Sequence, residues 1–170
     1  MNIQCLKILF SILLFSTIAV GQRKTRLLIN NEPFELPGKW KPIGKIENSA
    51  QWGFENEKAK LTLLINVRNP EKFEFYNREF SEFEFLNKFY VWEAEFWGKD
   101  DQNVEIEKID VNEKEKYIIW RLKVNDIENF ILHGMRNNKL IGISLSDNNK
   151  KEPKSRIEKI EYITNIYLRK

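Results

Sequence analysis

The sequence predicts an α+β fold, in which an antiparallel sheet of about six strands packs against a long helix and a C-terminal helix. Three observations support this prediction. Short segments on both sides of residues 70–97 alternate apolar and polar residues, as half-buried strands do. Within residues 70–97, aromatic residues recur every three or four positions, and a second helical pattern ends the chain. With one helix on each face of the sheet, the expected architecture is an α/β/α sandwich.

The first strands are expected before the long helix. They cover about 34–36, 40–46, 51–54 and 60–67. A turn signal, Pro37-Gly38, follows the first of them. The fourth is the clearest, because every second position is apolar: Leu61, Leu63, Ile65 and Val67.

The long helix is expected over residues 70–97. Pro70 suits its first turn, and Gly98 is typical of the residue that follows a helix end. Ser81 and Glu84 have the spacing of a capping box, so we expect the helix to break near Ser81.

Four more strands are expected after the long helix, in an antiparallel meander. They cover about 104–111, 117–124, 128–136 and 139–146. Asn125-Asp126 and Asn137-Asn138 suit two-residue hairpin turns, because Asn and Asp tolerate positive φ. A final helix is expected over 153–168, with Pro153 in its first turn.

Residues 1–21 have the order of an export signal. Lys7 supplies a positive charge, an apolar run follows, and Ala19 and Gly21 place small side chains before a cut at Gln22. The apolar run is shorter than the roughly 20 residues that a membrane span needs, although an uncleaved anchor is the alternative. We therefore expect an exported protein, periplasmic or secreted, with no transmembrane segment after cleavage.

After cleavage we expect a basic N-terminal tail over residues 22–29 and a single globular α+β domain over residues 30–170. The one cysteine, Cys5, leaves with the signal, and it precedes the apolar run, where a lipid-attachment cysteine does not occur. The mature domain therefore has no disulfide, thiol nucleophile or thiolate metal site. The formal net charge is +3, and the basic residues are spread along the chain. This distribution does not favour nucleic-acid binding.

The order of the expected elements resembles the PsbP-like fold. The segment Phe34–Trp40, which reads FELPGKW, is similar to the apolar–Pro–Gly–x–Trp opening of some members of that fold. The resemblance covers most of the mature chain. It implies a domain used chiefly for protein and assembly contacts, without general catalytic residues, and thus a binding role by analogy.

His133 is the only histidine, and it lies between apolar residues of the expected strand 128–136. This pattern is typical of a core histidine, but His133 is also a candidate general base. Ser144, on the next strand, is a candidate nucleophile, although the sequence has no Gly-x-Ser-x-Gly turn that would activate it.

We expect no metal and no cofactor. Asp100, Asp101 and Asn103 are oxygen ligands at close spacing, but the loop lacks the twelve-residue calcium pattern. The sequence also has no glycine-rich loop that could hold a phosphate group.

The aromatic residues of the long helix form two neighbouring stripes. The first, expected to face the core, consists of Phe73, Tyr76, Phe80, Phe83, Leu86, Tyr90, Ala94 and Trp97. The second consists of Phe85, Phe89, Trp92 and Phe96. Two stripes are wider than one core contact needs, so the second is a candidate binding surface. Trp40 and Trp52, in the less regular part of the chain, are further candidate binding residues.

Two functions remain open from the sequence. The favoured one is an exported non-catalytic domain that binds an unknown protein partner or an apolar ligand at the cell envelope. The alternative is a small envelope hydrolase that uses His133 with a carboxylate or with Ser144. A solvent-exposed His133 beside an acid would favour the hydrolase, and an exposed aromatic stripe would favour the binding domain.

Overall fold

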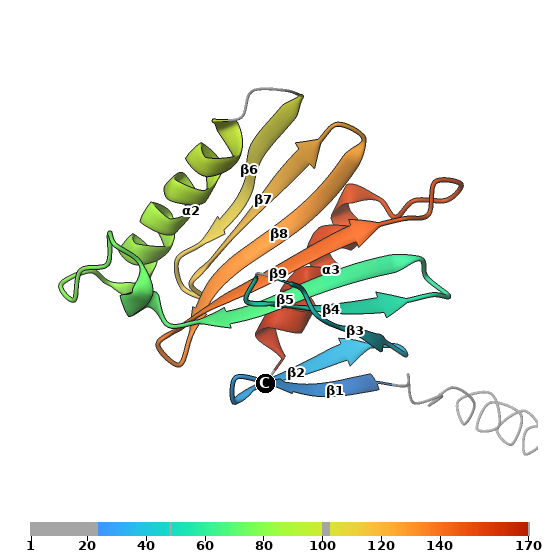
Figure 1. The fold of residues 1–170 in the computed structure, drawn as a ribbon, viewed down its shortest axis with the longest axis horizontal. Coiled ribbons are helices and arrows are strands. Elements are labelled where there is room, and N and C mark those ends of the chain that lie inside the picture. The colour runs from blue at the N-terminus through green and yellow to red at the C-terminus, as the bar shows by residue number, and fades with distance from the viewer. Residues whose placement is uncertain (1–23, 48, 100–102, 170) are drawn as a thin grey trace, which may run out of the picture.

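The structure is a computed structural model that describes residues 24–47, 49–99 and 103–169. Figure 1 shows its elements. The strands are β1 (Lys24–Ile29), β2 (Glu32–Pro37), β3 (Lys41–Lys45), β4 (Gln51–Asn56), β5 (Leu61–Arg68), β6 (Val104–Asn112), β7 (Tyr117–Val124), β8 (Ile127–Arg136) and β9 (Lys139–Asp147). The helices are the short 3₁₀ helix η1 (Pro70–Lys72), α2 (Glu82–Gly98) and α3 (Arg156–Leu168).

Seven of these strands form one antiparallel sheet in the order β3-β4-β5-β9-β8-β7-β6. The predicted α+β fold is therefore confirmed, with seven strands in the main sheet where about six were expected. The meander β6–β9 follows from its turns, because Asn125, Asn137 and Asn138 all have positive φ. These turns place consecutive strands side by side, whereas the β5·β9 pair joins the two halves of the chain.

The two α-helices cover opposite faces of the sheet. In β7, Ile118 belongs to the cluster around α2, whereas the next residue, Ile119, belongs to the cluster that contains α3 residues. The alternation along a strand therefore sends neighbouring residues to different helices. Figure 1 shows α3 passing behind the sheet. This arrangement is the expected α/β/α sandwich.

The basic tail predicted for residues 22–29 is wrong where the structure describes it, because Lys24–Ile29 is strand β1. It pairs with β2 through a turn at Asn30 and Asn31, both with positive φ. Ile29 is buried in the α3-side core, together with Phe34 and Leu36 of β2. The prediction weighed the basic residues and missed the alternation of Thr25, Leu27 and Ile29, whose side chains are more buried than their neighbours.

The long helix predicted over 70–97 is also shorter than expected. Only η1 and α2 are helical in this region, and the residues between them are not. The break near Ser81 is confirmed: Ser81 and Glu84 form the capping box that begins α2. In the same way Ser155 and Glu158 begin α3, so Pro153 precedes that helix. In both cases the reciprocal side-chain bonds to backbone N–H groups decide where the helix begins.

The predicted signal segment, residues 1–21, lies outside the described residues. Among the helices that the structure describes, none combines the length and apolar composition that crossing a membrane requires.

Close packing between α3 and the sheet depends on a glycine. The Tyr167 hydroxyl of α3 donates to the Met135 carbonyl oxygen at 2.8 Å, and its ring lies against Gly134 of β8. A Cβ atom at Gly134 would lie 2.5 Å from Tyr167 Cζ and 2.7 Å from Tyr167 Oη. The tyrosine can approach the strand only because this position has no side chain.

We predict that Gly134→Ala destabilises the protein by about 1–3 kcal/mol, because the added methyl group must displace the Tyr167 ring. The free energy of unfolding, measured by urea denaturation of the mature chain, tests this. Gly98→Ala is the matched control, since no atom lies within 4 Å of its added Cβ. An equal loss in both variants would contradict the proposed contact.

Candidate functional site

The predicted second stripe of α2 divides between the core and the surface. Phe85 and Phe89 are buried against the sheet. Trp92 is 37% exposed and Phe96 is 58% exposed. The N-terminal half of α2 packs more closely against the sheet than its C-terminal half. The stripe is therefore buried at Phe85 and Phe89 and becomes exposed toward Gly98.

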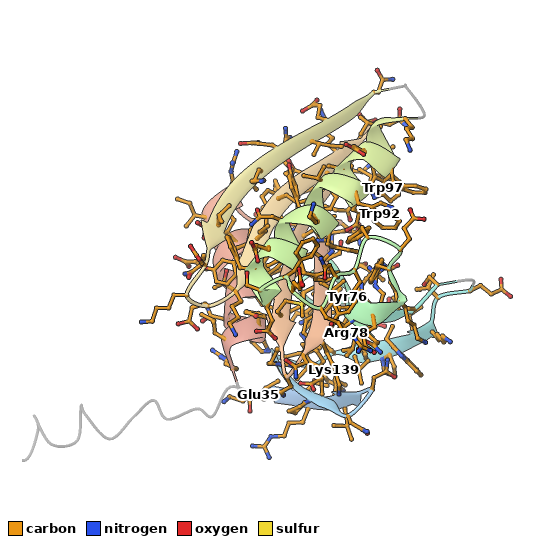
Figure 2. The ribbon with its side chains drawn as sticks, turned by 90° about the vertical axis from the view of Figure 1, so that its left-hand side faces the viewer. Glu35, Tyr76, Arg78, Trp92, Trp97 and Lys139 are labelled. Atoms are coloured by element: carbon orange, nitrogen blue, oxygen red, sulfur yellow. The ribbon has the colours of Figure 1, made fainter. Side chains whose placement is uncertain are left out.

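The exposed part of this stripe belongs to a larger apolar patch. We call it the α2 aromatic surface, and it consists of Phe75, Val91, Trp92, Phe96 and Trp97. The Trp92 and Phe96 rings stack with centroids 6.3 Å apart, and Trp97 meets Phe96 edge-on at 5.8 Å. Figure 2 shows Trp92 and Trp97 projecting from the side of α2.

A shallow cavity of about 430 Å³ lies within the α2 aromatic surface. Its apolar wall is formed by Phe75, Val91 and Trp92, and the Phe75 and Trp92 rings are 5.9 Å apart. Polar and charged residues complete the lining: Glu74, Asn87, Lys88 and Glu95. The patch therefore has an apolar centre with more negative than positive charge at its edge.

His133 lies beneath α2 and is only 2% exposed. The Trp120 indole N–H donates to His133 Nδ1 at 3.1 Å. An indole nitrogen can only donate, so Nδ1 carries no proton and the neutral ring holds its proton on Nε2. The Phe89 ring meets the imidazole edge-on, with centroids 4.8 Å apart.

Glu93 of α2 faces the other nitrogen of this imidazole. His133 Nε2 and Glu93 Oε2 are 3.1 Å apart, but Oε2 has no aligned hydrogen bond among the described residues. Burial raises the pKa of Glu93 to about 7, an effect that the Arg68 cation partly offsets. Burial, with a smaller contribution from Arg68, lowers the pKa of His133 to about 3. Both groups therefore favour their neutral forms inside the fold.

The structure does not bring the two candidate catalytic residues into contact. Ser144 of β9 pairs with Ile131, whereas His133 pairs with Gly142. No hydrogen bond joins Ser144 to His133 in the described residues. The acid that the hydrolase hypothesis requires is present as Glu93, but the imidazole is closed to solvent by α2. A general base in this position cannot reach a substrate, so the geometry does not favour the hydrolase.

Trp40 and Trp52 do not join the α2 aromatic surface. Trp40, expected in the more open part of the chain, is only 5% exposed and belongs to the α3-side core. Its indole N–H lies 2.9 Å from the Pro37 carbonyl oxygen and 3.1 Å from the Tyr162 hydroxyl, so its polar atom is satisfied internally. Trp52 is partly exposed, but it lies on β4, which α2 does not cover.

Two of the candidate calcium ligands, Asp100 and Asp101, lie outside the described residues, so the structure does not test that site. Within the part of the chain that the structure describes, no group of three or more His, Cys, Asp or Glu residues could hold a metal ion.

Sequence reasoning missed two aromatic members of the α2 aromatic surface. Trp97 was assigned to the stripe that faces the core, and Phe75 was assigned to neither stripe. Phe75 was missed because residues 73–80 do not continue the helix, so the period was counted through a break. Trp97 follows Leu86 by eleven residues and so points in the same direction, but it lies in the last turn of α2 and is 38% exposed, whereas Leu86 is buried.

These features define a class of protein: an α/β/α sandwich with an antiparallel sheet and an exposed aromatic patch on one helix. Among solved structures, the chain is similar to cyanobacterial PsbP (CyanoP) from Synechocystis sp. PCC 6803. The TM-score is 0.51 at 14% sequence identity, over 89% of this chain and 92% of that one. The chain thus has the PsbP-like fold that its sequence resembles. No protein-family model and no curated protein sequence matches it.

The buried Glu93 predicts a specific pH dependence. The folded protein retains a proton on Glu93 between its ordinary pKa of 4.5 and its raised pKa of about 7, whereas the unfolded chain releases it. Native stability attributable to Glu93 is therefore complete below pH 4.5 and is lost as the pH rises to 7. In the variant Glu93→Gln the side chain cannot ionise, so this loss of stability with rising pH is absent. Relative to the wild type, we expect the variant to gain about 1–3 kcal/mol of stability between pH 4.5 and pH 7.

Urea denaturation of both proteins at several pH values in this window measures the difference. Comparison with the wild type cancels the titration of other groups, including that of His133. Glu95→Gln removes a carboxylate from the exposed side of the same helix and controls for the loss of one negative charge. A difference between Glu93→Gln and the wild type that stays constant with pH would contradict the interpretation.

Proposed function

We propose that this protein is an exported, non-catalytic binding domain whose α2 aromatic surface binds a protein partner. The observation that carries the proposal is the group of exposed aromatic side chains on one side of α2, two of them tryptophans. Tryptophan side chains contribute strongly to protein interfaces, because they bury a large area with few rotatable bonds. Leaving them in water has no benefit for the fold itself, since the sheet is already covered by Phe85, Leu86 and Phe89.

The shape of the surface favours a protein partner over a small apolar ligand. A small-molecule site is concave and encloses most of its ligand. The α2 aromatic surface instead lies on the outside of a helix, and its cavity is shallow. A partner can cover such a surface by placing one apolar side chain in the shallow cavity, against Phe75, Val91 and Trp92, and by packing against the Phe96 and Trp97 rings.

The charges at the edge of the surface indicate the chemistry of the partner. Glu74 and Glu95 line the shallow cavity together with a single cation, Lys88. Neither carboxylate has a cation within 4.0 Å among the described residues. A partner with basic residues around an apolar centre therefore complements this surface.

Export is the second part of the proposal, and it rests on the order of charge, apolar run and small residues in residues 1–21. We expect the mature protein, recovered from the medium or the periplasm of the cells that make it, to begin at Gln22. Intact-mass measurement together with N-terminal peptide sequencing tests this. A mature chain that still begins at Met1 would contradict the cleavage, and recovery only with membranes would favour the uncleaved anchor.

The binding surface is tested with the double variant Trp92→Ser/Phe96→Ser. Proteins that bind the mature wild-type domain in a cell-envelope extract are identified, and their affinities are then measured with purified components. Since each side chain is expected to contribute at least about 1 kcal/mol, we expect the double variant to bind at least about tenfold more weakly. Ile157→Ser is the matched control, because Ile157 is an exposed apolar residue of α3.

Two results would contradict the proposed surface, and a third would change its occupant. A partner that binds the double variant and the wild type equally uses another face. If Ile157→Ser weakens the binding of a partner as much as the double variant does, binding responds to any loss of exposed apolar surface and not to the α2 aromatic surface in particular. Self-association that disappears in the double variant, measured by analytical ultracentrifugation, would identify a second copy of the chain as the occupant.

A further inference from the structure

A larger cavity lies at the other end of α2, away from the α2 aromatic surface. It has a volume of about 980 Å³ and is bounded by the end of β5, by η1 and by the β8–β9 turn. We call it the β5-end cavity. Figure 2 shows Tyr76, Arg78 and Lys139, which all line it, near one another. None of its lining residues lines the shallow cavity of the α2 aromatic surface.

The lining combines aromatic rings with cations. The aromatic members are Phe73, Tyr76, Phe80 and Phe85. The cations are Arg68, Lys72, Arg78 and Lys139. Two carboxylates, Glu71 and Glu82, also line the cavity. A lining of this kind can contact the apolar body and the negative charge of one ligand at the same time.

Two of these charges have ion-pair partners within the protein. Lys139 pairs with Glu32 at 3.0 Å, and Glu82 pairs with Lys116. In the described parts of the chain, neither Arg68 nor Arg78 has a carboxylate oxygen within 4.0 Å. The same holds for Lys72. Three cations therefore remain against one carboxylate, Glu71, and the cavity is positively charged.

Arg68 is partly buried, whereas Lys72 and Arg78 are exposed. The Nε of Arg68 donates to Asn66 Oδ1 at 3.1 Å. Asn66 is itself buried, and it fits there because Gly142 has no side chain: a Cβ atom at Gly142 would lie 2.5 Å from Asn66 Nδ2. The Arg68 guanidinium lies 5.5 Å from the Phe73 centroid and 5.3 Å from the Phe89 centroid. The only side-chain hydrogen bond of Arg68 within the described residues uses Nε, which leaves the forked end of the guanidinium for another acceptor.

The surroundings of Arg68 favour an anion at that forked end. Burial lowers the pKa of the Arg68 guanidinium, and the Glu93 carboxylate only partly offsets this effect from a longer distance. Glu93 is a weak counter-charge, because burial also raises its own pKa to about 7. A desolvated guanidinium without a close carboxylate is costly, and an anionic ligand would offset that cost.

We propose that the β5-end cavity binds an amphiphilic anion, meaning an anionic oxygen headgroup joined to an apolar body. Arg68 contacts the headgroup through its guanidinium fork, and Arg78 and Lys72 add attraction at the mouth. The apolar body lies against the Phe73, Tyr76, Phe80 and Phe85 rings. Carboxylates and phosphates share this headgroup chemistry, so fatty acids and lipid phosphates are both candidate sources.

Isothermal titration calorimetry of the mature protein separates these sources. The probes, each below its micelle concentration, are dodecanoate, dodecyl phosphate, uncharged dodecyl maltoside and inorganic phosphate. We expect one molar equivalent of dodecanoate or dodecyl phosphate to bind more tightly than the other two probes. The tighter of these two amphiphiles identifies the source. Equal binding of dodecyl maltoside, or no binding of either anionic amphiphile, would overturn the proposal.

Variants locate the binding site. Arg68→Gln is expected to weaken binding of the anionic amphiphile at least about tenfold, and Arg78→Gln about threefold. Arg78 is an exposed residue, so this second variant keeps the proposal testable if Arg68→Gln folds poorly. Lys151→Gln, which removes an exposed cation distant from the cavity lining, is the matched control and should change the affinity less than about twofold.

The same titration distinguishes this cavity from the proposed protein-binding surface. Trp92→Ser removes a ring from the α2 aromatic surface, and we expect it to leave the affinity for the amphiphile unchanged. If Trp92→Ser abolishes binding of the amphiphile and Arg68→Gln does not, the ligand occupies the α2 aromatic surface and the proposal is wrong. Equal affinity of wild type, Arg68→Gln and Arg78→Gln would also overturn it.

Discussion

The central strands β5, β9, β8 and β7 have buried side chains on both faces of the sheet, and this need for cover on both sides organises the rest of the structure. The face with Leu63, Ile143 and Leu132 is covered by α3 and by the β1–β2 hairpin. The opposite face is covered by α2, which contacts mainly β6, β7 and β8. The hairpin is therefore part of the core, although its sequence begins with basic residues. The incomplete cover on the α2 side leaves room for the β5-end cavity.

The position of α2 explains why one helix carries two kinds of aromatic residue. Near its beginning, Phe85 and Phe89 fill the layer between helix and sheet. Near its end, Trp92, Phe96 and Trp97 contact one another on the outside of the helix. Phe73 connects the two groups, since its ring lies 5.1 Å from Phe89 and 5.8 Å from Trp92. The exposed rings are thus supported by the core, which holds them in place.

Polar groups beneath α2 form a second, less usual layer. Trp120, His133 and Glu93 lie in line from the sheet to the helix, and Arg68 lies against the Phe89 ring beside them. Burial disfavours the charged forms of His133 and Glu93, so the layer is held by neutral contacts below the raised pKa of Glu93, which is about 7. Arg68 is the member that keeps its charge, and it lies where this layer opens into the β5-end cavity. A cation with no carboxylate oxygen within 4.0 Å among the described residues is therefore placed next to the β5-end cavity.

Local signals determined much of this protein without the structure. The Asn137-Asn138 turn, the Ser81 capping box and the alternation of Leu61–Val67 each depend on residues close in the chain, and each was predicted. Tertiary structure decided the rest. Trp40 is buried because Tyr162, more than a hundred residues later, lies beside it. Arg68 and Phe73 meet α2 only once β5 and the helix are packed together. Short-range geometry determines turns, helix caps and the spacing of apolar residues. Burial instead depends on which distant segments pack together and exclude water, and no local pattern contains that information.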